Sequence, residues 1–259
     1  NVNNVYYHSE IHSEEQSIVN QVITNCNKIT NNKIKFISNW GGNTLYDPRD
    51  LPWKDMQNTP ETFTKFRKAV EKGIAIQKPV EPLTAKIAKS HPKFDEIGDV
   101  SSLKQLGCEM DDVDIDKRTQ FPFAGGETSA IERLNNYIWG SSGSSRGALT
   151  TYKQTRNGSI GSEYSTKFSP FLAHGNLSPR LIYNNVKNFE NKTGISNDST
   201  YWVYFELLWR DFFRFSSCKY GDKIFYLNGP YGKSLYSLFA DPNWKWSHDK
   251  VLFNKWCNG

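Results

Sequence analysis

The segment from Thr200 to Tyr220 carries aromatic side chains on almost every face when it is drawn as a helix. A helix that is apolar all round is stable only where other elements bury it or where it lines a crevice. The stretch from Glu127 to Trp139 also has helical spacing, which puts Ile131, Leu134 and Ile138 on one face. These two segments predict a substantial helical domain.

Two serine–proline pairs mark further helix starts. Ser169 precedes Pro170 and Ser178 precedes Pro179. Serine is a preferred N-cap, and proline is tolerated at the first helical position. We therefore expect a mostly α-helical domain over residues 125–259.

The beginning of the chain has a different pattern. Val5 to His8 predicts a short strand, Ser13 and Gln16 form a capping box for a helix that runs to about Asn27, and Lys33 to Trp40 predicts a second strand. Strand, helix and strand at this spacing form a parallel βαβ unit. Residues 1–75 are therefore expected to be part of a Rossmann-like α/β domain.

A third predicted helix, Pro60 to Lys72, completes this part of the chain. Thr59 is its expected N-cap, and Phe63, Phe66 and Val70 share one face. Prolines at positions 79, 82, 92 and 122 and an acidic run at 109–116 then predict a connector over residues 76–124. The predicted fold is thus an α/β domain followed by a helical domain.

Composition limits the class of protein. The 259 residues are 37% hydrophobic, which is too apolar for a disordered chain. No run of about 18 apolar residues could span a bilayer, and four well-spaced cysteines form no disulfide framework. We expect an intracellular protein with no membrane partner. Because the chain opens at Asn1 without a leader, we also expect it to be part of a longer polypeptide, truncated at both ends.

The basic residues are concentrated in one segment. Residues 141–234 hold 12 lysines and arginines against 6 acidic residues, an excess of six, whereas the rest of the chain is nearly neutral. A local positive field suits phosphate or nucleic acid, although a solvated basic surface is the simpler interpretation.

One loop combines hydroxyls with a basic residue. Ser165, Thr166, Lys167 and Ser169 lie just before a predicted helix, and Tyr152 and Arg156 lie upstream. Unpaired N–H groups at a helix start favour phosphate, so this loop is a candidate diphosphate site. The alternative is that Ser169 only caps its helix and the other hydroxyls satisfy a turn.

The aromatic helix carries the second candidate. Trp202, Glu206, Trp209, Arg210 and Phe213 share one face at helical spacing. Glutamate and arginine are costly to bury unless they are paired or bind a ligand, and a planar ring would suit the neighbouring aromatics. The alternative is an internal Glu206–Arg210 pair in an ordinary core. The chain has no metal-binding histidine or cysteine pattern, so no metal site is predicted.

These segments together resemble the photolyase/cryptochrome family, and within it the DASH branch. The resemblance extends over nearly the whole chain. It rests on Gly125–Thr128, Tyr152–Asn157, Ser165–Pro170, Gly175–Arg180 and Tyr201–Arg214, with Gly42–Tyr46 and Phe63–Val70 upstream.

The resemblance implies a blue-light flavoprotein with an α/β antenna domain and a helical FAD-binding domain. Such proteins use excited reduced FAD to pass an electron to a cyclobutane pyrimidine dimer in DNA, which then splits. DASH members resemble photolyases that act best on single-stranded DNA, where a lesion leaves the stack at low cost. The implied activity is that of a deoxyribodipyrimidine photo-lyase. The alternative is a non-catalytic photoreceptor that binds nucleic acid or a protein partner.

The resemblance also assigns roles to residues. FAD contacts are implied for Tyr152, Ser165, Thr166, Lys167, Phe168, Ser169 and Arg210. DNA contacts are implied for Arg156, Glu206, Trp209 and Phe213. Glu206 would hydrogen-bond the damaged bases and Trp209 would stack on them, which makes these two the catalytic candidates. Glu10 is a candidate contact for a folate antenna, 5,10-methenyltetrahydrofolate, or else a surface carboxylate.

The family pattern extends beyond this chain at both ends. It includes earlier antenna strands and later helices that hold the isoalloxazine ring and a tryptophan relay. We therefore expect the chain by itself to bind FAD poorly and to be inactive.

Overall fold

A computed structural model describes residues 3–31, 33–41, 43–82, 84, 101–107, 119, 121–140, 147–158, 161–226, 229–231 and 247–259. The chain divides into two compact units. The sheet unit comprises residues 1–39, 53–61 and 213–259, and the helical unit comprises residues 40–52 and 62–212. Much of the predicted connector 76–124 lies outside the described residues, so the predicted domain boundaries stay a prediction.

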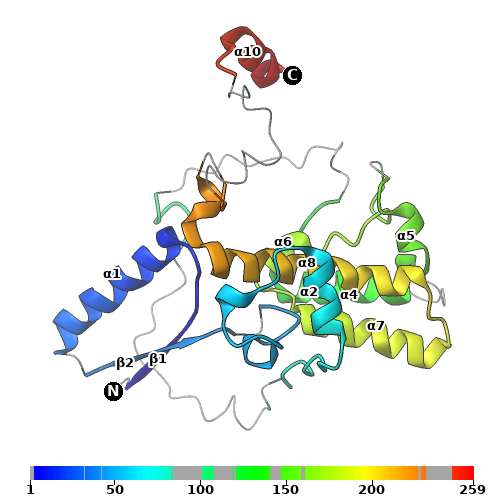
Figure 1. Cartoon of the computed structure of the whole chain (residues 1–259), viewed down its shortest axis with the longest axis horizontal. Coiled ribbons are helices and arrows are strands. Elements are labelled where there is room, and N and C mark those ends of the chain that lie inside the picture. Colours follow the sequence, from blue (N-terminus) through cyan, green and yellow to red (C-terminus); the bar gives the residue numbers. More distant parts are fainter. Residues whose placement is uncertain are drawn as a thin grey trace. The chain divides into compact units, whose positions relative to one another are not determined.

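The sheet unit contains the predicted βαβ arrangement (Figure 1). Strands β1 (Asn4–His8) and β2 (Lys35–Asn39) pair in parallel, with Asn4 opposite Lys35 and His8 opposite Asn39. Helix α1 (Ser13–Thr30) connects them. The same unit holds the 3-10 helices η2 (Met56–Asn58) and η4 (Gly221–Phe225), and helix α10 (Lys250–Asn258). The predicted parallel unit is confirmed.

The start of α1 differs from the predicted capping box. His12 is the N-cap residue and makes no side-chain cap hydrogen bond. The amide of Ser13 donates instead to the Asp222 carboxylate at 3.1 Å, and Gln16 donates through its side chain to the carbonyls of Glu10 and Ile11. The predicted box is wrong because an acceptor distant in sequence meets the first free amide.

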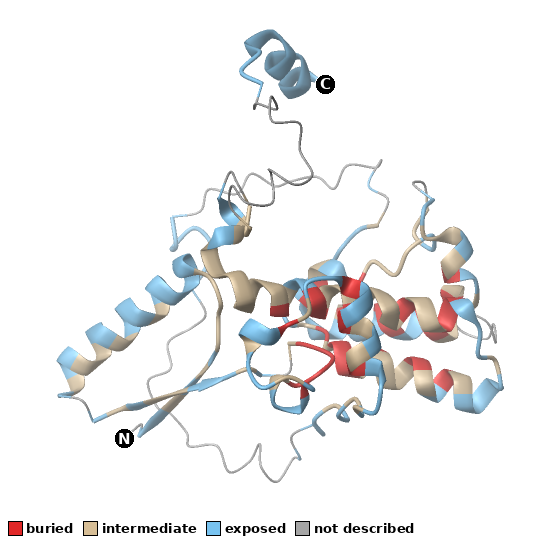
Figure 2. Cartoon of the chain, viewed as in Figure 1, coloured by how far each residue is buried: buried red, intermediate tan, exposed pale blue. Residues whose placement is uncertain are grey.

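The helical unit is built from α2 (Phe63–Glu71), α4 (Gly126–Trp139), α5 (Tyr152–Thr155), α6 (Ser169–Ala173) and α7 (Pro179–Thr193). It also contains η1 (Pro48–Asp50), η3 (Ala148–Thr151) and the part of α8 (Asp198–Tyr220) that ends at residue 212. Helix α4 packs against α6 and α7. Figure 2 shows buried residues throughout these helices, whereas α1 has none.

The core of the helical unit is aromatic and aliphatic. Its fully buried large side chains are Tyr137, Phe66, Phe189, Leu45, Leu134, Ile138, Leu149, Leu177, Ile182, Leu208 and Val70. The predicted face of α2 is confirmed, because Phe63, Phe66 and Val70 are buried. On α4, Leu134 and Ile138 are buried as predicted, but Ile131 is 37% exposed. Burial on that helix centres on Ala130, Leu134 and Tyr137, which puts Ile131 at its edge.

Two predicted helix caps are misplaced. Thr62, not Thr59, is the N-cap of α2, because Thr59 closes the preceding 3-10 turn by donating to the Met56 carbonyl at 3.1 Å. Ser169 is the first residue of α6 and Phe168 is its N-cap, with no side-chain cap bond. Ser178 is the N-cap of α7, as predicted.

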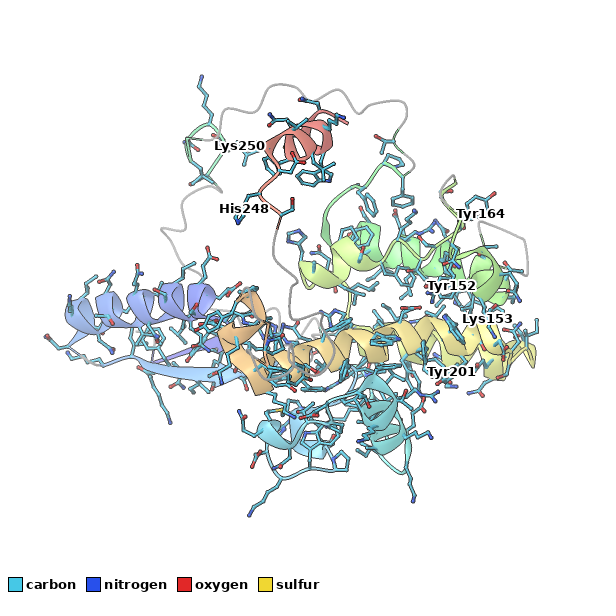
Figure 3. The ribbon with its side chains drawn as sticks, turned by 45° about the horizontal axis from the view of Figure 1, so that its top comes forward. Tyr152, Lys153, Tyr164, Tyr201, His248 and Lys250 are labelled. Carbon is cyan, nitrogen blue, oxygen red and sulfur yellow. The ribbon has the colours of Figure 1, made fainter. Side chains whose placement is uncertain are left out.

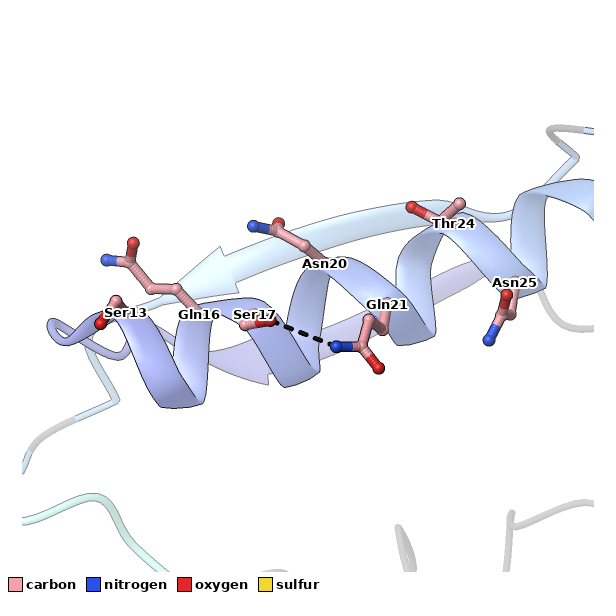
Figure 4. Close-up of a pocket in the computed structure, with 7 residues that line it drawn as sticks. All are labelled: Ser13, Gln16, Ser17, Asn20, Gln21, Thr24 and Asn25. Carbon is pink, nitrogen blue, oxygen red and sulfur yellow. Dashed lines mark hydrogen bonds between the residues drawn. The ribbon is translucent and has the colours of Figure 1, made fainter.

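One face of α1 is uniformly polar and uncharged (Figure 4). A shallow cavity of about 430 Å³ there is lined by Ser13, Gln16, Ser17, Asn20, Gln21, Thr24 and Asn25. The Gln21 side chain donates to the Ser17 hydroxyl at 3.2 Å. None of the described helices is long and apolar enough to cross a membrane.

Candidate functional site

The hydroxyl-rich loop before α6 is held by an arginine that the sequence interpretation did not single out. Arg133 of α4 is 5% exposed. Its guanidinium donates to the carbonyls of Ser162 at 2.7 Å, Ser165 at 3.1 Å and Thr166 at 2.9 Å, and to the Glu163 carboxylate at 2.9 Å. The loop is therefore anchored on the core through its backbone.

The next residues have a conformation that suits an anion. Lys167 has a φ of 58°, in the left-handed region, and Phe168 follows with φ −83° and ψ −15°. Alternating left- and right-handed residues can turn successive N–H groups toward one point and so form an anion-binding nest. The Phe168 amide of this turn also donates to the Thr166 hydroxyl at 3.5 Å. The Phe168 ring is 3% exposed and anchors this turn. Among the described residues, no acidic side chain forms a salt bridge with Lys167.

Tyr137 links this loop to the predicted FAD-contacting tyrosine. The Tyr137 ring meets Phe168 edge-on at 5.7 Å between centroids and Tyr152 edge-on at 6.3 Å. Tyr152 is buried, and burial raises the pKa of its hydroxyl, so it stays protonated and able to donate. The structure thus brings Tyr152 and the loop 165–169 to one side of α4.

A close backbone approach sets the position of α5. A Cβ atom added to Gly147 would lie 2.3 Å from the Tyr137 carbonyl oxygen and 2.6 Å from the carbonyl group of Ile138. Glycine at this position lets η3, and α5 after it, pack directly on the end of α4. The sequence interpretation missed this role, and residues 141–146 just upstream lie outside the described ranges.

Arg156 and Glu206 form an ion pair between the end of α5 and helix α8. Their side chains are 32% and 36% exposed, and the Arg156 guanidinium lies 5.8 Å from the Trp202 ring centroid. Figure 3 shows Tyr152 and Lys153 of α5 beside α8, and Lys153 pairs with Asp198 at 2.6 Å. The ion pair recorded for Glu206 is thus with Arg156 of another helix, whereas the alternative interpretation paired it with Arg210.

Arg210 instead fastens α8 to its neighbours. Its guanidinium donates to the carbonyl of Asn43 and, at 3.4 Å, to the carbonyl of Leu172 at the end of α6. Two of its donors are thus used within the protein. The contact with Leu172 keeps α8 adjacent to α6, the short helix that follows the turn at Lys167 and Phe168.

Trp209 does not share the surroundings of Glu206, although the helical spacing predicts a common face. Its indole stacks on Phe63 of α2, with 3.6 Å between centroids and a 10° interplanar angle, and meets Phe212 edge-on. Phe213 is 61% exposed. The structure therefore gathers Tyr152, Arg156 and Glu206, but it directs the Trp209 ring toward α2.

A buried carboxylate beside Arg210 is a further residue that the sequence interpretation missed. Asp211 is fully buried and accepts hydrogen bonds from the amides of Leu45 at 3.0 Å and Tyr46 at 2.9 Å. Burial raises the pKa of Asp211 to about 7, against the lowering effect of these two amides. Asp211 thereby fixes the loop that precedes η1 to α8.

Glu10 belongs to the sheet unit. Its carboxylate lies 3.5 Å from the Arg214 guanidinium, which also donates to the Ser9 carbonyl. A cavity of about 240 Å³ is lined by Tyr7, Ser9, Glu10, Gln16, Val19, Asn20 and Ser38.

No family model matches the chain, but comparisons with individual proteins do. The chain is 41% identical over 260 residues to cryptochrome DASH of Danio rerio, and 40% identical over 259 residues to that of Xenopus laevis. Each match covers 100% of this chain and 45% of the relative. The crystal structure of a Synechocystis sp. PCC6803 cryptochrome superposes with a TM-score of 0.75 at 36% identity, covering 98% of this chain and 47% of that one.

This chain is a homologue of cryptochrome DASH. A class III photolyase from Agrobacterium tumefaciens shares the fold alone, with a TM-score of 0.66 at 18% identity over 98% of this chain and 47% of its own length. The predicted family and the predicted α/β part followed by a mostly helical part are confirmed. The chain spans about half the length of the cryptochrome DASH relatives that it matches.

Proposed function

We propose that the full-length protein is a blue-light flavoprotein that holds FAD, and that this chain supplies the phosphate-binding side of the FAD site. Homology to cryptochrome DASH supports the class of protein. The observation that carries the proposal is the turn at Lys167 and Phe168, anchored by Arg133 and adjacent through Tyr137 to Tyr152.

The residues present fit a diphosphate. Ser165, Thr166 and Ser169 offer hydroxyl donors, Lys167 offers a cation, and the turn offers converging N–H groups. Tyr152 would contact the cofactor. Phe168 is buried, so its ring would support the turn from the protein side. Arg210 would line the FAD site, with its guanidinium held in place by hydrogen bonds to two backbone carbonyls.

We further propose that the protein repairs cyclobutane pyrimidine dimers, preferentially in single-stranded DNA. When bound in its reduced form and excited by light, FAD would be the electron donor. Of this chain's residues, Arg156 would bind a backbone phosphate and Glu206 would accept a hydrogen bond from the damaged bases. The recorded Arg156–Glu206 contact joins one guanidinium N–H to one carboxylate oxygen, so the remaining donors and acceptor sites of this partly exposed pair are available to DNA. Trp209 and Phe213 would provide apolar surface beside the lesion.

Illumination of the full-length protein with a dimer-containing oligothymidylate tests the repair function. Recovery of absorbance near the thymine band, with wild-type protein and not with Glu206→Ala, supports repair. No recovery despite bound reduced flavin would contradict it and support the second candidate function.

The second candidate is a photoreceptor that binds nucleic acid or a protein partner without turnover. It is favoured by the internal contacts of two proposed lesion-binding groups: Arg156 is paired with Glu206, and Trp209 is stacked on Phe63. Trp209→Ala separates the two candidates. If bases stack on Trp209, affinity for dimer-containing strands falls by about 1–3 kcal/mol while affinity for undamaged strands is unchanged. If Trp209→Ala instead leaves the affinity for both kinds of strand unchanged, the photoreceptor is favoured.

A folate antenna is the finer part of the cofactor proposal. Glu10 lines a polar cavity at the end of β1, and its carboxylate could accept from the amino group of a pterin ring. The absorption spectrum of the purified full-length protein tests this directly. A folate band that disappears in Glu10→Gln supports the proposal, and its persistence in that variant would contradict it.

A further inference from the structure

Arg133 makes an unusually complete set of contacts with one short stretch of backbone. Four of its N–H···O contacts reach three carbonyls and one carboxylate within residues 162–166. Its guanidinium also lies close to two rings, 4.8 Å from the centroid of Phe121 and 5.1 Å from that of Tyr137. A planar guanidinium can stack and donate in its own plane at once, which a lysine ammonium cannot do.

These contacts constrain the residue that follows. The carbonyls of Ser165 and Thr166 are drawn toward α4, and the next residue, Lys167, is in the left-handed region. That conformation costs a non-glycine residue about 1–2 kcal/mol, so surrounding contacts must hold it. Arg133 holds the turn on its N-terminal side, and the buried Phe168 holds it on the other.

We propose that Arg133 is the positioning residue that shapes this turn for a diphosphate, and thereby sets the preference of the site for FAD over a flavin without phosphates. The inference rests on the proposed function. Arg133 acts through backbone carbonyls of the loop, and it leaves the hydroxyls of Ser165 and Ser169 to the ligand.

The test compares FAD and riboflavin binding by the full-length protein, measured by flavin fluorescence. Arg133→Met removes the donors at similar length, and Arg133→Lys keeps the buried charge without the planar fork. Glu132→Gln, at the exposed neighbouring position of α4, is the control. We expect both Arg133 variants to bind FAD about tenfold or more weakly, with riboflavin affinity unchanged. Glu163→Gln keeps the three carbonyl contacts of Arg133, so its FAD affinity should fall much less.

A readout without flavin accompanies this titration. Amide hydrogen exchange over residues 161–168 should be faster in the flavin-free Arg133 variants than in wild type or Glu132→Gln. If Arg133→Met does not fold, Arg133→Lys carries both measurements. A general loss of packing would instead lower riboflavin and FAD affinity equally.

The two proposals fail in different ways. If wild-type protein does not distinguish FAD from riboflavin, the proposed diphosphate site is wrong whatever the variants do. If wild type prefers FAD and the Arg133 variants keep that preference, the site stands and the role of Arg133 is overturned.

Discussion

Buried ionisable residues hold the loop around residues 43–47 within the helical unit, and the pKa values of two of their carboxyls are shifted in opposite directions. Asp211 is fully buried, which raises its pKa to about 7. The Arg49 side chain donates to Asp47 and is the main cause that lowers the pKa of that carboxyl to about 2. Arg180 lies 3.6 Å from the same Asp47 carboxylate.

We predict that Asp211 makes the protein less stable as pH rises toward neutrality. Its pKa in the folded state exceeds the unfolded value of 3.8, so the folded state holds the extra proton between these limits. The free energy of unfolding should fall by about 2 kcal/mol from pH 5 to pH 7 through this group. In Asp211→Asn, chemical denaturation at the two pH values should show that this part of the difference is gone.

Asp47→Asn is the control for that experiment. With a pKa of about 2, Asp47 is ionised at both pH values in both states, and its contribution is lost only as pH falls from about 4 toward 2. The control should therefore keep the wild-type difference between pH 5 and pH 7. A wild-type difference in Asp211→Asn as well would contradict the assignment.

Trp209 illustrates how one side chain can carry a structural as well as a proposed binding role. Its indole is stacked on Phe63. We predict that Trp209→Ala lowers the free energy of unfolding by about 3 kcal/mol, because the stacked ring surface is lost. Phe213→Ala, at a position 61% exposed, should cost less than about 0.5 kcal/mol. Equal small effects in urea denaturation would show that the stacking does not contribute to stability.

At the scale of elements, apolar spacing predicted the buried face of α2, whereas the starts of α1, α2 and α6 were not predicted. The buried face of α2 follows from three apolar residues at helical spacing. The start of α1 could not be predicted, because its acceptor, Asp222, is remote in sequence. On α8, spacing alone could not decide that Trp209 turns toward α2 while Glu206 faces α5, since both directions lie within one broad face.

The junction between α4 and α5 gives the clearest prediction for an element. Gly147 and Gly125 are both N-cap residues with similar backbone angles, φ −71° and −72°. A Cβ at Gly147 would overlap the backbone of Tyr137, whereas nothing lies within 4 Å of one at Gly125. Gly147→Ser should therefore destabilise the protein by about 1–3 kcal/mol or more, because the chain must shift to admit the new atoms. Serine suits an N-cap, so Gly125→Ser should be neutral or stabilising in thermal melts. Similar melting temperatures for the two variants would mean that the close approach is not required.

At the scale of the whole molecule, the sequence predicted the class of fold and the family but not the contacts that organise the site. The spacing of apolar residues and the lengths of the segments predicted the parallel strands and the aromatic helix. Arg133 and Asp211 gave no such signal, because a charged residue on a helix is usually solvent-exposed, and only the fold shows which backbone groups it meets. The predicted site residues therefore stay a prediction, and they did not include Arg133 or Asp211, whose contacts hold the surrounding loops.

Two basic residues of the segment 141–234 are paired with acidic residues of the same segment, in the Arg156–Glu206 and Lys153–Asp198 pairs. We predict that Glu206→Gln strengthens binding of undamaged single strands by the full-length protein, because it releases Arg156 for a phosphate. The slope of log affinity against log salt should then steepen by about one contact, and Arg156→Gln should make it shallower by a similar amount. Unchanged slopes in both variants would exclude Arg156 from the nucleic-acid surface.

We propose above all that the turn at residues 165–169 and the part of α8 around Arg210 contribute to one FAD site. Amide hydrogen exchange of the full-length protein with and without FAD tests it most directly. We expect slower exchange on FAD binding at residues 165–171 and in α8 around Arg210. Protection confined to other parts of the protein, with these two segments unchanged, would contradict it.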